Sequence, residues 1–308
     1  QVAKDERLKV IESGSDWLKV QTAGGQMAWV AASAVKAVPA AGSVGGTPDT
    51  QKVVNVTHRL DTAFKIAGNL YYVGTVTLNS FLISTPQGAI LINTNFEDTI
   101  PLLKTSLEQV GFKWSDVKII LGSHAHPDHM QADATVKELT GGAQVMAMEQ
   151  DVPALKNMTV GNKPHPIDRV LKDGDTVTLG GTTLTAHLTP GHTRGCTTWT
   201  MKVQDGAKSY NVNITCGGLQ DGARLVGNKN YPEIADDFAK SVKVYRTLPT
   251  DIFLNAHSWF FDLAGKKAKM GAATNPFVDP AGYKRFVDNM ERDLNMMLAE
   301  QRKNPPAD

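Results

Sequence analysis

One short segment of this chain carries a dense cluster of potential metal ligands. His124, His126, Asp128 and His129 fill four of the six positions of the sequence HAHPDH, directly after the apolar run Val117–Leu121. Such a run is typical of a strand buried on both faces of a sheet. Loops that leave these strands are where α/β proteins build their sites, and zinc prefers imidazole and carboxylate ligands. The segment therefore predicts a metal site at the end of a buried strand.

The spacing within this segment favours two ion positions. In an extended backbone His124 and His126 can point toward one ion, whereas Asp128 and His129 turn the other way to hold a neighbouring one. The alternative is a polar surface loop. We disfavour it because only eight histidines occur in 308 residues.

Two further histidines follow predicted strands. His192 lies in the turn TPGHTRG after a strand predicted at Thr182–Leu188, and His257 follows a strand predicted at Asp251–Asn255. A lone histidine after a strand is more often structural than a ligand. Their spacing relative to the HAHPDH cluster favours ligands here.

The rest of the main region alternates predicted strands and helices. Strands are predicted at Tyr71–Val76, Asn79–Ser84 and Ala89–Ile92, and apolar residues at helical spacing predict helices near 100–110, 234–245 and 283–297. The formal charge of +1 gives no basic face for nucleic acid, and no apolar stretch is long enough to span a bilayer. Neither kind of partner is indicated.

Residues 1–37 predict a small β-rich segment, with short strands at Leu8–Ile11, Trp17–Gln21 and Met27–Val30. Residues 38–52 are rich in Pro, Gly, Ser and Ala and predict a linker, so the main domain is expected to span 53–308. The segment LKVIESGSDWLKVQTAGGQMAWVAASAVKAV resembles the later half of a bacterial Src-homology-three-like barrel. We favour the alternative that it is a structural extension of the main domain.

Cys196 and Cys216 are the only cysteines. They can pair in an oxidising compartment or remain two buried thiols. The sequence gives no distance between them, and unpaired thiols are the interpretation we favour.

The HAHPDH segment, the PGHTRG turn and the later AHSWFF segment together resemble the H-x-H-x-D-H, G-H-T and terminal-histidine motifs of metallo-β-lactamase-fold hydrolases. In order and spacing, the flanking segments NLYYVGTVTLNSFLISTPQGAILINTN, VGFKWSDVKIILGSHAHPDH and LTPGHTRGCTTWTM resemble the B3 subclass of β-lactamases. The resemblance spans about residues 65–300. It implies an α/β fold, the αββα metallo-β-lactamase sandwich with a small N-terminal β extension, and a periplasmic or secreted enzyme. No leader is present in this sequence, which begins at Gln1.

The resemblance also implies two zinc ions per chain. Their ligands would be His124, His126 and His192 for the first ion, and Asp128, His129 and His257 for the second. The implied reaction is hydrolysis of the β-lactam amide bond by a metal-bound hydroxide, oriented by Asp128, which gives resistance to β-lactam antibiotics.

Three positions depart from the family pattern. Asn93 stands where many relatives carry an aspartate, and Pro127 is an uncommon residue between His126 and Asp128. Gly218 stands where the B3 subclass often has a serine that helps to hold substrate, so Gly218 and Gln220 are only candidate substrate contacts.

Other functions stay open. A lactonase or a thioester hydrolase of the glyoxalase II type resembles this pattern, but such relatives usually place a second aspartate between the PGHT turn and the last histidine. The corresponding stretch here, Asn213–Gly218, has no carboxylate, and the nearest is Asp221. A zinc-binding protein without catalysis is a further alternative. The sequence leaves the oligomeric state open.

Overall fold

The structure is a computed structural model. It describes residues 59–160, 163–220 and 222–306, together with the backbone of three N-terminal strands. The chain divides into two compact units, Gln1–Arg59 and Leu60–Asp308. In the first unit, β1 (Lys9–Ser13), β2 (Trp17–Gln21) and β3 (Met27–Ala31) form an antiparallel sheet in that order. Residues 38–52, which the sequence predicts as a linker, lie outside the described residues. The domain boundaries and the role of the first unit stay predictions.

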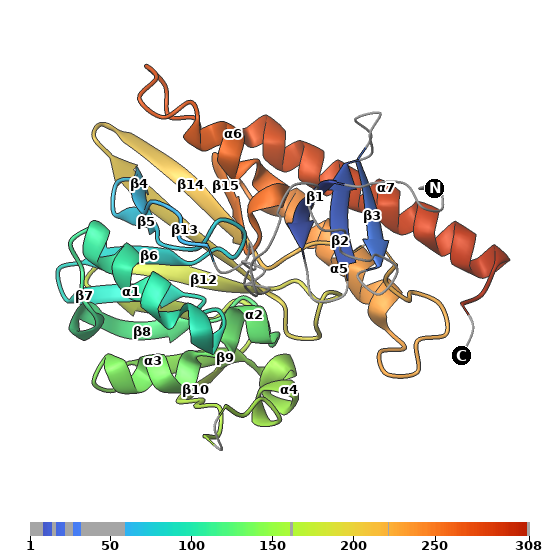
Figure 1. The fold of residues 1–308 in the computed structure, drawn as a ribbon, viewed down its shortest axis with the longest axis horizontal. Helices are drawn as coiled ribbons and strands as arrows, with labels where there is room; N and C mark the ends of the chain where they lie inside the picture. Colours follow the sequence, from blue (N-terminus) through green and yellow to red (C-terminus); the bar gives the residue numbers. More distant parts are fainter. Residues whose placement is uncertain are drawn as a thin grey trace, which may run out of the picture. The chain divides into compact units, whose positions relative to one another are not determined.

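Two mixed sheets form the centre of the second unit (Figure 1). The seven-stranded sheet has the order β10-β9-β8-β7-β6-β5-β4. Its strands are β4 (Phe64–Ala67), β5 (Leu70–Tyr72), β6 (Phe81–Thr85), β7 (Gly88–Ile92), β8 (Val117–Leu121), β9 (Gln144–Met148) and β10 (Arg169–Leu171). The five-stranded sheet consists, in order, of β11 (Thr176–Leu179), β12 (Thr182–Leu188), β13 (Thr197–Asp205), β14 (Lys208–Thr215) and β15 (Ile252–Asn255).

Helices cover the outer faces of the two sheets. The α-helices are α1 (Ile100–Gln109), α2 (Pro127–Met130), α3 (Asp133–Leu139), α4 (Val152–Lys156), α5 (Ile234–Thr247), α6 (Leu263–Lys267) and α7 (Pro280–Lys303). The 3-10 helices are η3 (Glu97–Thr99), η4 (Trp114–Asp116), η5 (Glu149–Asp151) and η6 (Ser258–Phe261). One core joins the two sheets to α5 and α7, and a second lies between the seven-stranded sheet and helices α1 and α3. The predicted αββα sandwich is confirmed.

The side-chain pattern explains these layers. On β6, Phe81 and Ile83 enter the larger core, whereas Leu82 between them enters the core beneath α1. Both faces of this strand are therefore buried, as its nearly continuous apolar sequence predicts. On α7, Tyr283, Phe286, Met290 and Leu294 recur at helical spacing and are all buried, which fixes the helix against the five-stranded sheet.

The predicted strand Tyr71–Val76 is shorter than expected. β5 ends at Tyr72, and the chain then turns, with the Thr75 amide bonded to the Leu78 carbonyl at 2.8 Å. The Asn79 amide donates to the Ala256 carbonyl at 3.0 Å. This turn places the start of β6 beside the residues that follow β15. None of the helices in the described part of the chain combines the length and the apolar character that a bilayer crossing requires.

Candidate metal centre

The chain segments with potential ligands leave the carboxyl ends of four strands. β8 leads to His124–His129, β12 to His192, β14 to Cys216 and β15 to His257. α2 begins at Pro127, a residue well suited to the first turn of a helix, and its first turn carries Asp128 and His129. The carboxyl ends of β12, β14 and β15 lie at one edge of the five-stranded sheet, and the segment that follows β8 of the seven-stranded sheet meets them there. The six residues that the sequence singles out are brought together at this edge.

His124, His126 and His192, which we call the first set, face one another. The distances between their ring centroids are 4.7 Å for His124 and His126, 4.4 Å for His124 and His192, and 4.8 Å for His126 and His192. One nitrogen from each ring lies within 4.8 Å of the other two. The Nε2 atoms of His124 and His192 are buried and have no hydrogen-bond partner among the described residues.

Asp128, His129 and His257, the second set, converge on a neighbouring point. The Nε2 atoms of His129 and His257 are 3.1 Å apart. Asp128 Oδ2 lies 3.2 Å from the first of these nitrogens and 3.7 Å from the second. The two sets are adjacent, since the rings of His124 and His129 are only 4.3 Å apart.

The electrostatics of this cluster suit a cation. Burial, together with repulsion from His129, holds the pKa of His124 and of His257 well below the usual value. Burial and repulsion from His126 lower the pKa of His192 to about 3. Neutral imidazoles offer lone pairs to a metal ion. Zinc binds imidazole nitrogens and carboxylate oxygens. The first set offers two histidine nitrogens that have no other partner among the described residues, and the second set offers two histidines and a carboxylate. The residues therefore fit two zinc ions.

Asp128 supplies negative charge to the second set. Burial alone would raise the pKa of its carboxyl group. Attraction to His129 and a hydrogen bond from that ring outweigh the burial and hold this pKa far below its usual range. Asp128 is therefore a carboxylate at neutral pH.

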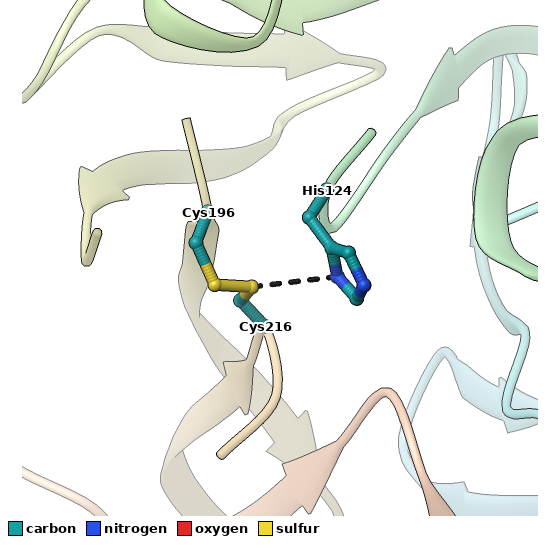
Figure 2. A group of neighbouring side chains, drawn as sticks. All are labelled: His124, Cys196 and Cys216. Atoms are coloured by element: carbon teal, nitrogen blue, oxygen red, sulfur yellow. Dashed lines mark hydrogen bonds between the residues drawn. A yellow bond between two sulfur atoms is a disulfide. The ribbon is translucent and has the colours of Figure 1, made fainter. Parts of the chain in front are cut away.

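A disulfide joins Cys196 and Cys216, with their Cα atoms 5.6 Å apart. Both residues are buried, and Figure 2 shows Cys216 Sγ beside Nδ1 of His124, at 3.5 Å. Our preference for unpaired thiols was wrong. The sequence separation hides their proximity, which the β13–β14 hairpin creates by pairing Trp199 with Ile214. Ser123 Oγ lies 3.2 Å from the same His124 nitrogen and is a better hydrogen-bond acceptor than the disulfide.

Asn93 directly follows β7 and forms hydrogen bonds beside the cluster. Its Oδ1 accepts a hydrogen bond from the Ser123 amide at 2.8 Å, and its Nδ2 donates to the Asn79 carbonyl at 3.2 Å. These two contacts fix the amide, whose Nδ2 lies 3.4 Å from Nδ1 of His129. His129 therefore has an amide nitrogen nearby, where a carboxylate would offer it a strong acceptor.

The two candidate substrate contacts lie on the chain that follows β14. Gly218 is buried, and a Cβ atom there would approach the Phe260 ring to 2.6 Å, so a larger residue at this position would require the ring to shift. Gln220 is exposed. Trp259 is 49% exposed and stacks on His257 with a centroid distance of 4.3 Å, which makes it an aromatic wall that the sequence did not single out.

Among the residues that the structure describes, two other histidines lie outside the cluster. His165 is buried, with Nε2 at 3.0 Å from Asp133 Oδ2, and His187 is hydrogen-bonded to Thr200 Oγ1 at 2.7 Å. Both have local structural partners.

Comparisons with known proteins place this geometry in context. Residues 73–205 match the metallo-β-lactamase superfamily. The native FEZ-1 metallo-β-lactamase from Legionella gormanii is 44% identical, with 79% of this chain and 98% of that chain covered and a TM-score of 0.75. The class B3 di-zinc metallo-β-lactamase LRA-12 from an Alaskan soil metagenome is 32% identical, with 79% and 97% covered and a TM-score of 0.72.

A hydroxyacylglutathione hydrolase from Hyphomonas neptunium is similar over a shorter stretch. It is 42% identical over 77 residues, which are 25% of this chain and 26% of the hydrolase. The chain spans less than a third of the length of the curated relatives it matches.

Proposed function

Because this chain belongs to the metallo-β-lactamase superfamily and is a hydrolase of that class, we propose that it hydrolyses the β-lactam amide bond. The first set would hold one zinc ion and the second set another. Two zinc ions are supported by the convergence of nitrogen ligands in the first set, by the nitrogen and carboxylate contacts of the second set, and by the similarity to a di-zinc enzyme.

The observation that carries this proposal lies between the His192 turn and β15. Residues 213–218 are all buried and contain no carboxylate, and this stretch reaches the cluster at Cys216 and Gly217. Cys216 Sγ lies 3.5 Å from Nδ1 of His124 and is bonded to Cys196 in the disulfide. A thioester hydrolase of the glyoxalase II type would place a second metal-binding aspartate in this stretch. Its absence from residues 213–218 favours the β-lactam substrate.

Zinc, when bound, lowers the pKa of water and polarises a carbonyl group. The residues of this chain have separate tasks. The carboxylate of Asp128 stays ionised and can accept a hydrogen bond from the attacking water, which orients the water toward the carbonyl carbon. Trp259 covers the ring of His257 and offers an apolar wall to the substrate. Gly218 and Gln220 are proposed to line the substrate beside this wall.

A periplasmic or secreted location and a role in antibiotic resistance belong to the same proposal. The Cys196–Cys216 disulfide supports the location, because disulfides persist mainly in oxidising compartments. The resistance role follows from the proposed substrate alone.

Thioester hydrolysis is the second candidate, because of the similarity to hydroxyacylglutathione hydrolase over 77 residues. The test is hydrolysis by zinc-loaded protein of a chromogenic cephalosporin, a homoserine lactone and a glutathione thioester. We expect the cephalosporin to give a kcat/KM at least about a hundredfold above the other two. A preference for the thioester would replace our proposal with the second candidate. Turnover of the lactone alone would overturn both.

A further inference from the structure

Asp151 is a buried carboxylate that belongs to neither proposed ligand set. It ends η5, which directly follows β9, and only 3% of the residue is exposed. Its Oδ2 accepts hydrogen bonds from the Ala125 amide and the Thr193 hydroxyl, both at 2.8 Å. Its Oδ1 accepts one from the Gly195 amide at 2.7 Å. Three short hydrogen bonds satisfy a charge that would otherwise be costly to bury.

The three donors come from the two loops that carry the first set. Ala125 lies between His124 and His126, whereas Thr193 and Gly195 follow His192. These loops leave β8 and β12, which belong to different sheets. One side chain from a third loop therefore connects them, and no atom of the second set is among its hydrogen-bond partners.

Gly195 gives independent evidence that this connection is tight. A Cβ atom on Gly195 would lie 2.5 Å from the Asp151 amide nitrogen and 2.6 Å from its Cβ and Cγ atoms. Any larger residue would push the loop after His192 away from the carboxylate. The last glycine of PGHTRG and Asp151 thus form a matched pair, separated by 44 positions in the sequence.

We propose that Asp151 is a positioning residue that holds His126 and His192 at the spacing that one zinc ion requires, and so sets the zinc affinity of the first set alone. This inference rests on the proposed ligand assignment. It does not depend on the substrate.

The test is zinc binding to the full chain with Asp151→Asn. Asparagine keeps the size but replaces one acceptor oxygen with an NH₂ group, which faces an N–H or O–H donor. To isolate the first set, the substitution is also made in an Asp128→Asn background, in which the second set lacks its carboxylate. Affinity is measured by competition with a chromogenic chelator, and thermal unfolding is followed in parallel.

We expect Asp151→Asn to weaken first-set zinc binding by about 10- to 100-fold in both backgrounds, as other groups that orient metal ligands do. Second-set affinity should change by less than about threefold. The matched control is Asp251→Asn, because Asp251 Oδ2 also accepts two hydrogen bonds, from the amide and side chain of Asn211. Asp251 precedes β15, whereas His257 follows it, so this variant should lose stability while both zinc affinities stay parental.

Thr193→Val provides a second variant if Asp151→Asn does not fold. It removes one of the three donors and should lower first-set affinity on the order of threefold to tenfold. Parental first-set affinity in the folded variants would overturn the proposal, as would equal weakening of both sets. These measurements use no substrate, so a chain that fails to open β-lactams yet shows the selective loss refutes the proposed function and leaves this inference standing.

Discussion

The two proposed ligand sets differ in where their negative charge lies. The second set contains its own carboxylate, Asp128, in contact with both of its histidines. The first set consists of three histidines, and the buried carboxylate of Asp151 accepts hydrogen bonds from the backbone amides of Ala125 and Gly195 in the loops that carry them. The first set therefore depends on the geometry of two loops, whereas the second depends on a ligand charge. This difference predicts that the sets can be damaged separately.

The largest effect should come from removing the charge of the second set. Asp128→Asn keeps the size of the side chain but gives a neutral, weaker oxygen ligand. We expect kcat to fall about a hundredfold or more, because the attacking water also loses its acceptor. Zinc content should drop to about one ion, held by the first set. Two zinc ions with parental affinity and turnover within about threefold would show that another carboxylate, such as Asp221, has this role.

Lowering the pH should destabilise the zinc-free protein, because the histidines of the first set are held neutral in the folded chain. The pKa of His192 is about 3 in the folded chain, and those of His124 and His126 are also lowered, mainly by burial. Unfolded histidines titrate near 6.5, so between about pH 6.5 and pH 3 the unfolded chain binds more protons. Stability must then fall as the pH drops.

Each histidine that stays neutral contributes about 1.4 kcal/mol per pH unit in that window. Urea unfolding of chelator-treated protein at pH 7, 6, 5 and 4 measures how the free energy of unfolding changes with pH. The control is His192→Gln, in which this pH dependence should be weaker because one of the three histidines is missing. A midpoint that does not move between pH 6 and pH 4 would contradict the burial argument.

Removing the disulfide should mainly lower the stability of the fold, with a smaller loss of zinc affinity at the first set. Cys196→Ser with Cys216→Ser opens a loop of 20 residues and should lower the free energy of unfolding by about 3 kcal/mol. Because Cys216 lies against His124, first-set zinc affinity should also fall, while the second set keeps its affinity. Calorimetry and zinc competition on the same variant test this. Equal loss at both sets would mean that the disulfide has only a global effect.

The smallest effect is expected from removal of residues 1–52. All six proposed ligands lie at or after His124, within the compact unit Leu60–Asp308. Turnover and both zinc affinities should stay within about twofold of those of the full chain. A well-folded truncated chain with two zinc ions and no activity would assign the N-terminal unit a role in catalysis.

The sequence predicted those elements whose patterns are local. β8 and β12 have the predicted bounds, since the first is an uninterrupted apolar run and the second ends at a clear Pro-Gly turn. β13 and β14 were not predicted. Their period-2 pattern was overlooked: Trp199, Met201 and Val203 on β13 alternate with polar residues and enter the core. On β14, Val212 and Ile214 do the same.

The candidate site was predictable where its residues cluster and not where it depends on contacts between loops. The segment HAHPDH predicts four ligands within six consecutive residues. Asp151 has no such signal, because its role exists only once the loops after β8, β9 and β12 meet. The disulfide was not predicted because the β13–β14 hairpin, which brings Cys196 and Cys216 together, was not predicted. A carboxylate just after a buried strand was the one available hint of Asp151.

Zinc titration of chelator-treated wild-type protein tests directly whether both ligand sets bind zinc and whether turnover needs both. Metal analysis and cephalosporin turnover are followed together as zinc is added in steps. We expect binding that saturates at two ions per chain, no turnover before zinc is added and full turnover only with both sets filled. A plateau at one ion or fewer, with full activity, would contradict the assignment of two separate ligand sets.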